Sequence, residues 1–120
     1  MTIISAILVA LVAIEHVYIL ILEMFLWTTP RARKAFGTSK PFAEDTKSLA
    51  ANQGLYNGFL AAGLFWGLIY PEAAIGHQIQ IFFLGCVLVA AVYGGLTAKR
   101  SILFVQGLPA FVALAFVSIS

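Results

Sequence analysis

Charged residues are scarce in this chain of 120 residues, because Asp, Glu, Lys and Arg together make up only 10% of it. Soluble domains carry about 25% of such residues, and here 62% of the residues are hydrophobic. A chain this short cannot hide so much apolar surface in one globule, so the composition excludes an ordinary soluble domain and favours the lipid bilayer. Since lipid offers the backbone no hydrogen bonds, the spanning segments must be helices, and we predict an all-α integral membrane protein.

The chain has only one cysteine, and it has no recognisable catalytic or metal-binding motif. The single cysteine, Cys86, lies in an apolar run and cannot form an internal disulfide. The two histidines and this cysteine lie in different parts of the sequence and do not suggest a metal site. The chain has no phosphate-binding loop, nucleophile elbow or haem-attachment motif. We therefore predict no metal and no cofactor, and the sequence identifies no catalytic residue.

Basic residues are absent from the long apolar runs, which cover roughly residues 3–27, 49–70, 77–97 and 101–119. The first connection holds Arg31, Arg33, Lys34, Lys40 and Lys47, the third holds Lys99 and Arg100, and the second holds none. By the positive-inside rule, the first and third connections are cytoplasmic and both termini lie outside. We predict a single transmembrane domain over residues 1–120, folded as a four-helix bundle. Its basic connections would face anionic lipid heads rather than nucleic acid.

The first connection contains signals for the start and the end of a helix. Thr28 or Thr29 can cap a helix, Pro30 suits its first position, and Gly37 suits its end. The intervening RARKAF combines basic residues with Phe36. This pattern predicts a short helix at the cytoplasmic interface, and a solvated loop fits the same residues equally well. The following GTSKPFAEDTKS is expected to be a polar segment that leads into the second span.

Ionisable residues inside the first span are costly and need an explanation. This span carries Glu15, His16 and Glu23, and no Lys or Arg lies within any span to neutralise the acids. Each acid must therefore be protonated, be hydrogen-bonded to a neutral group on another helix, or face water. His16 and Glu23 lie on one stripe of the helix, with Trp27, but about 10 Å along the axis separates them, too far for a direct bond.

Depth in the membrane groups the polar residues of all four spans. The candidates nearest the cytoplasmic end are Glu23, Asn52, Gln53, Tyr56, Tyr93 and Gln106, and Asn57, His16 and Glu15 lie nearer the middle. We predict that these residues line a cytoplasm-facing polar pocket and bind a ligand or exchange protons. The amides can instead hold helices together, since such interhelical hydrogen bonds contribute about 0.6 kcal/mol on average. Tyr93 can equally be an interfacial anchor.

Small residues mark where helices can approach closely. The second span has two G-x-x-x-G faces, formed by Gly54 with Gly58 and by Gly63 with Gly67. These faces predict that the second helix packs against partners on two sides. In the fourth span, Pro109 with Gly107 can kink the helix and free a carbonyl near Val105.

The stretches WTTPRARKAFG and ANQGLYNGFLAAGL resemble an uncharacterised family of small bacterial membrane proteins, domain of unknown function thirteen-oh-four. The resemblance covers nearly the whole chain, and NQGLYNG is its most specific part. It implies a four-helix protein of the bacterial inner membrane, and it implies no activity and no catalytic residue.

Three classes of function remain open. The polar pocket favours binding or transport of a small amphiphile or ion, with proton exchange at Glu23 and His16. A membrane enzyme on a lipid-like substrate would use Glu15, His16 and Glu23 as acid-base groups. An accessory subunit would use the glycine faces to bind a larger partner. Because four helices enclose only a narrow pathway, we expect a homodimer.

Overall fold

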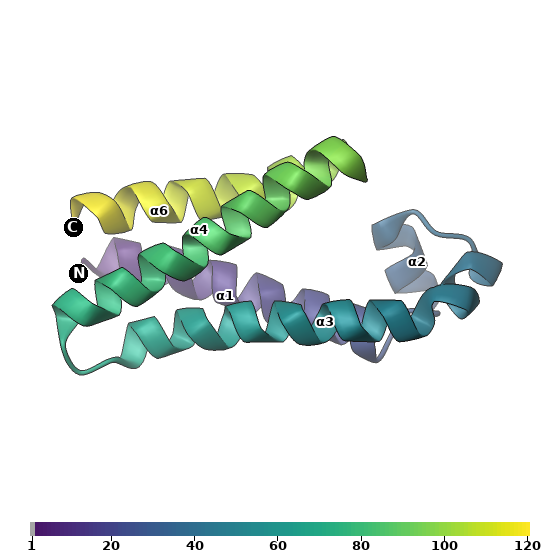
Figure 1. Cartoon of the computed structure of the whole chain (residues 1–120), viewed down its shortest axis with the longest axis horizontal. Coiled ribbons are helices and arrows are strands. Elements are labelled where there is room, and N and C mark those ends of the chain that lie inside the picture. Colours follow the sequence, from purple (N-terminus) through teal and green to yellow (C-terminus); the bar gives the residue numbers. More distant parts are fainter. Residues whose placement is uncertain (1) are drawn as a thin grey trace. The chain divides into compact units, whose positions relative to one another are not determined.

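Every regular element of residues 2–120, which the computed structural model describes, is helical (Figure 1). The first four are α1 (Ile3–Met24), α2 (Pro30–Phe36), α3 (Lys40–Ile69) and α4 (Ala73–Thr97). The last helical run comprises α5 (Arg100–Ile102), a π-helical turn η1 (Leu103–Gly107) and α6 (Leu108–Ile119). The prediction of an all-α protein is confirmed.

The chain divides into two compact units. Unit 1 comprises Met1–Ile14 and Leu60–Ser120, and unit 2 comprises Glu15–Phe59. The boundaries fall within α1 and within α3, so each unit contains a part of both helices. The single domain that we predicted over residues 1–120 stays a prediction.

The core of unit 1 is built from small and branched side chains of four helices. Its buried members are Val9, Val12 and Ala13 of α1, Leu64 of α3, Leu84 and Val87 of α4, and Ala110, Ala113 and Val117 of α6. Figure 1 shows α4 and α6 as antiparallel helices. Gly107 permits their approach, because a Cβ atom built on it would lie 3.2 Å from the Cβ atom of Ala91. Small side chains therefore let these helices pack at short range.

The α3–α4 hairpin of unit 1 is tighter still. A Cβ atom built on Gly76 would lie 2.6 Å from the carbonyl oxygen of Gly67, and one built on Gly63 would overlap the ring of Phe83. Gln80 is fully buried, and its Nε2 donates to the same Gly67 carbonyl at 3.0 Å. That carbonyl belongs to the last turn of α3, where no intrahelical donor is available. The predicted second glycine face thus packs on α4, and Gln80 completes the end of α3.

Both ends of α2 in unit 2 have the predicted caps. The Thr29 hydroxyl accepts a hydrogen bond from the Ala32 backbone N–H at 3.4 Å, and Pro30 is the first helical residue. Gly37 ends the helix in the left-handed conformation, with φ of 69°, which glycine adopts without a steric penalty. The helix predicted for RARKAF is confirmed, and the loop alternative is wrong.

The third helix begins at Lys40, well before the predicted start of the second span near residue 49. Ser39 explains the early start, because its Oγ accepts from the backbone N–H of Phe42 at 3.3 Å, as an N-cap does. The indole Nε1 of Trp27 donates to Thr46 Oγ1 at 3.1 Å. This bond links the α1–α2 connection to the first turns of α3. Most of the segment GTSKPFAEDTKS, which we expected to be a polar connection, is therefore part of α3.

Three helical segments are long and apolar enough to cross a membrane, namely Ile3–Met24, Ala73–Thr97 and Arg100–Ile119. They correspond to the predicted first, third and fourth spans. The predicted second span lies within α3, which is not one of the three. Asn52, Gln53 and Asn57 lower the mean hydropathy of this helix, although its residues 58–69 are strongly apolar.

Candidate functional site

Two glycines of α3 bring α1 close in unit 2. A Cβ atom built on Gly54 would lie 3.1 Å from the Cβ of Glu23 and 3.2 Å from the carbonyl oxygen of Leu20. One built on Gly58 would lie 2.6 Å from Cδ1 of Leu20. The first G-x-x-x-G face therefore packs on α1, as the spacing predicted. This close approach puts the carboxyl group of Glu23 within reach of Asn57.

The centre of the candidate site is the hydrogen bond between Asn57 and Glu23. Asn57 Nδ2 donates to Glu23 Oε1 at 2.6 Å. The Glu23 side chain is only 6% exposed, and Asn57 is half-buried. Within residues 2–120, Glu23 makes no other hydrogen bond and no ion pair with Lys or Arg. The sequence left three possibilities for this acid: protonation, a hydrogen bond to a neutral group on another helix, or contact with water. The structure shows the second, a hydrogen bond to a neutral amide on α3.

Glu15 and His16 form a second polar pair in unit 2. His16 is 1% exposed, and its Nδ1 lies 4.0 Å from Oε1 of Glu15. This separation exceeds a hydrogen bond, and the two groups form an ion pair only when His16 is protonated. Oε1 of Glu15 is buried and makes no hydrogen bond in the part of the chain that the structure describes. Adjacent helix positions point about 100° apart, yet the two long side chains still approach each other.

The other candidates on α3 do not join the Glu23–Asn57 pair. Asn52, Gln53 and Tyr56 are exposed, and the Tyr56 ring packs edge-on against Phe59 at 5.7 Å. Across residues 2–120, neither Asn52 nor Gln53 forms a side-chain hydrogen bond. These two amides therefore do not link helices within unit 2.

Tyr93 and Gln106 belong to unit 1, so the polar layer that was predicted to include them stays a prediction. Tyr93 is 70% exposed, and Gln106 is half-buried in η1. The π-helical turn directly precedes α6, whose second residue is Pro109. Because proline has no backbone N–H, one carbonyl in this turn lacks a helical donor. The predicted distortion near Pro109 is therefore present, as a π-helical turn.

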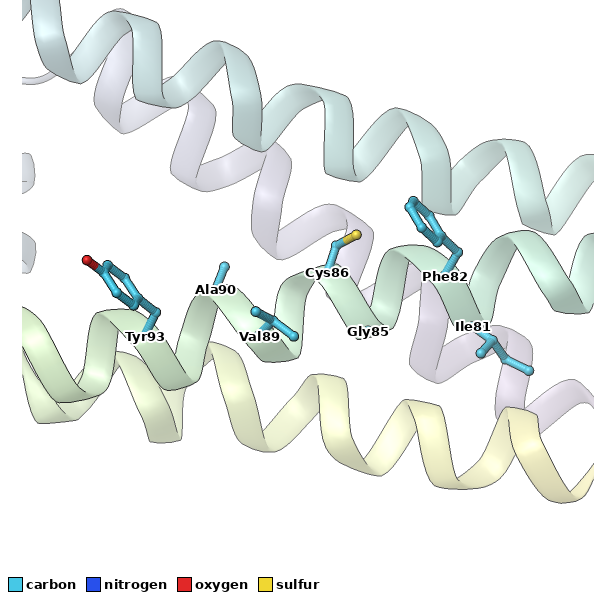
Figure 2. Close-up of a pocket in the computed structure, with 7 residues that line it drawn as sticks. All are labelled: Ile81, Phe82, Gly85, Cys86, Val89, Ala90 and Tyr93. Atoms are coloured by element: carbon cyan, nitrogen blue, oxygen red, sulfur yellow. The ribbon is translucent and has the colours of Figure 1, made fainter.

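One face of α4 borders a hollow that sequence reasoning did not identify (Figure 2). The hollow measures about 730 Å³, and its lining consists of Ile81, Phe82, Gly85, Cys86, Val89, Ala90 and Tyr93. Phe82 is 64% exposed and Val89 is 71% exposed. Apolar residues at four-residue spacing, at positions 81, 85, 89 and 93, are the signal that could have revealed this face.

Metal binding finds no support among these residues. Within residues 2–120, no group of three or more His, Cys, Asp or Glu side chains is arranged to hold a metal ion. The site in unit 2 therefore offers hydrogen bonding and two carboxyl groups.

Comparison with known proteins places the chain in a family. A family model described as "Protein of unknown function (DUF1304)" matches residues 10–118. The chain belongs to the DUF1304 family. This confirms the resemblance seen in WTTPRARKAFG and ANQGLYNGFLAAGL, and the matched range contains Glu15, His16, Glu23 and Asn57.

A curated relative of this DUF1304 protein matches over almost its whole length. It is the uncharacterized protein YpaA of Lactococcus lactis subsp. lactis (strain IL1403), which is 34% identical over 116 residues. The match covers 95% of this chain and 96% of YpaA. No solved structure matches the chain.

Proposed function

We propose that this DUF1304 protein crosses the bacterial inner membrane four times, with both termini outside and the basic connections in the cytoplasm. The apolar part of α3 would supply the span that hydropathy alone leaves out. At about 1.5 Å per residue, the 30 residues of α3 extend for about 45 Å, whereas the hydrocarbon core measures about 30 Å. The charged segment 40–49 would therefore project into the cytoplasm beside α2, and residues 50–69 would span.

We further propose that unit 2 contains a cytoplasm-facing polar pocket that binds or transports a small molecule or ion and exchanges protons at Glu23. The observation that carries this proposal is the buried Glu23 carboxyl, which has an amide partner and, in the part of the chain that the structure describes, no Lys or Arg partner. A hydrogen bond that only joined two helices would not need an ionisable group, and ionisable groups within membranes mark ligand and proton pathways. Glu15 and His16 would take part as a second ionisable pair, and Asn52, Gln53 and Tyr56 as residues at the pocket entrance.

Proton flux through reconstituted protein tests this role of Glu23. Liposomes with a pH-sensitive dye inside would receive an acid pulse, and we expect wild-type protein to acidify them faster than protein-free liposomes. Glu23→Gln keeps an oxygen for the Asn57 amide but cannot exchange a proton, so its flux should fall to the protein-free level. Glu44→Gln removes an exposed carboxyl from the start of α3 and should behave like wild type. Unchanged flux in Glu23→Gln would refute the assigned role.

A second candidate function, that of an accessory membrane subunit, is favoured by the exposed apolar face of α4. Large side chains such as Phe82 and Val89 lie uncovered there, beside the small residues Gly85 and Ala90. A partner helix could pack on this face at close range. In an accessory role, a helix of a larger membrane partner would occupy this face. A second copy of the chain in the same place would instead give the homodimer that we propose from the small size of the bundle, and a lone, stable homodimer would count against the accessory role.

A further inference from the structure

We propose that the Glu23–Asn57 pair binds a small organic ammonium ion. This inference rests on the proposed function of unit 2 as a ligand site, and it assigns the chemical class of the ligand. An ammonium ion brings a positive charge and N–H donors, which complement the groups that the pair leaves free.

The orientation of the Asn57 amide decides which groups are free. The amide nitrogen donates to Glu23 Oε1, which is the arrangement that an ionised carboxylate requires, because it only accepts hydrogen bonds. Oδ1 of Asn57 and Oε2 of Glu23 accept no hydrogen bond within residues 2–120. Neither oxygen is among the enclosed polar atoms without a partner, so both remain accessible. The pair thus presents two acceptor oxygens and one remaining amide N–H to an incoming molecule.

The helical segments that form the pair carry acids and no Lys or Arg. Unit 2 has five basic residues, and all of them lie within residues 31–47, outside these segments: Arg31, Arg33, Lys34, Lys40 and Lys47. The basic group in this part of α1 is His16, whose ring lies 4.0 Å from Glu15. Lys and Arg are absent from α1 and from residues 50–69 of α3. Within residues 2–120, Glu23 forms no ion pair with Lys or Arg. An anionic ligand would therefore meet an unpaired carboxylate in a medium of low dielectric constant, where like charges repel strongly.

Coordination chemistry favours an ammonium ion over a metal cation. Hard metal cations such as calcium take about six to eight oxygen ligands, and no metal-holding group of side chains occurs among the described residues. An ammonium group has up to three N–H donors and can bridge two acceptor oxygens. Leu20 lies about one turn before Glu23 on α1 and packs at Gly58, the residue after Asn57, so a short alkyl group on the nitrogen would meet apolar surface.

Radiolabelled butylammonium is the probe for this inference, with butyrate and butyramide as an anion and a neutral molecule of the same chain length. The purified chain would be studied in phosphatidylcholine nanodiscs, whose headgroups offer no N–H donors. We expect saturable binding that unlabelled butylammonium displaces and that butyrate and butyramide do not. Glu23→Gln should bind at least about tenfold more weakly, because a charge-assisted hydrogen bond is lost. Glu23→Asp should retain part of the affinity, and Glu44→Gln should retain all of it.

Two sources could supply the ammonium group, a soluble amine or the ethanolamine headgroup of a lipid. If phosphatidylethanolamine in the nanodisc displaces butylammonium, the group comes from the lipid, and if it does not, a soluble amine is favoured. Both results support the ammonium assignment. Circular dichroism and gel filtration would establish that each variant is folded.

The inference would be overturned if butyrate bound in a manner that depends on Glu23, or if Glu23→Gln bound butylammonium as wild type does. Absence of saturable binding, together with proton flux that depends on Glu23, would overturn the ammonium assignment and leave the proposed function intact. Wild-type flux in Glu23→Gln would overturn the proposed function itself.

Discussion

Replacing Gly76 by alanine is expected to destabilise the α3–α4 hairpin, because the added methyl group has no room. A Cβ atom at this position would lie 2.6 Å from the backbone oxygen of Gly67. That oxygen is part of a helix and cannot rotate away as the end of a flexible side chain could. It also accepts the hydrogen bond from Gln80, so a shift of α3 would strain two contacts together.

Gly85 of the same helix provides the matched control. A Cβ atom built there meets nothing within 4 Å. Both alanine variants gain helix propensity, which contributes about 1 kcal/mol when glycine is replaced within a helix. Overpacking costs about 1–3 kcal/mol, and it applies only at position 76. We therefore expect Gly76→Ala to be about 1–3 kcal/mol less stable than Gly85→Ala. Within a single chain, where the added methyl group meets nothing, Gly85→Ala should be at least as stable as wild type.

Unfolding in mixed micelles measures this difference. The helical circular dichroism signal would be followed while the fraction of sodium dodecyl sulfate is raised, for wild type and both variants. The midpoint for Gly76→Ala should fall below that for Gly85→Ala. Equal midpoints, or a higher one for Gly76→Ala, would refute the reasoning from close backbone packing. Gly76→Ser offers a second variant with a side chain at the same position, and it should also lower the midpoint.

Two further predictions concern assembly and topology. If copies of the chain pair through the exposed α4 face, mild oxidation of membranes should produce a disulfide dimer through Cys86. The variant that combines Cys86→Ser with Val87→Cys should give no such dimer, since Val87 is 1% exposed. A wild-type chain that stays monomeric under oxidation would contradict pairing at this face. A fluorescent protein fused after Ser120 should be dark and an alkaline phosphatase fusion active, because the orientation that we propose from the basic connections has the C-terminus outside. A bright fusion would overturn this orientation.

Features that depend on neighbouring residues could be predicted from the sequence alone. Thr29, Pro30 and Gly37 define α2 because capping and left-handed backbone geometry are properties of single positions. The glycine spacing of α3 also predicted two faces for close packing, and these faces pack on α1 and on α4. The same capping chemistry at Ser39 was available in the sequence, and the polar composition of the segment that follows it concealed this helix start.

Which groups of different helices meet was decided only by the tertiary structure. Glu23 and Asn57 are 34 positions apart, and their hydrogen bond forms because Gly54 and Gly58 set the rotation and distance of α3 against α1. Membrane depth placed Asn52 and Gln53 near the same level, but depth says nothing about the direction in which a side chain points, and both amides are exposed. Composition and periodicity therefore determine that this chain forms helices suited to a membrane, whereas helix rotation determines which of their polar groups make a site.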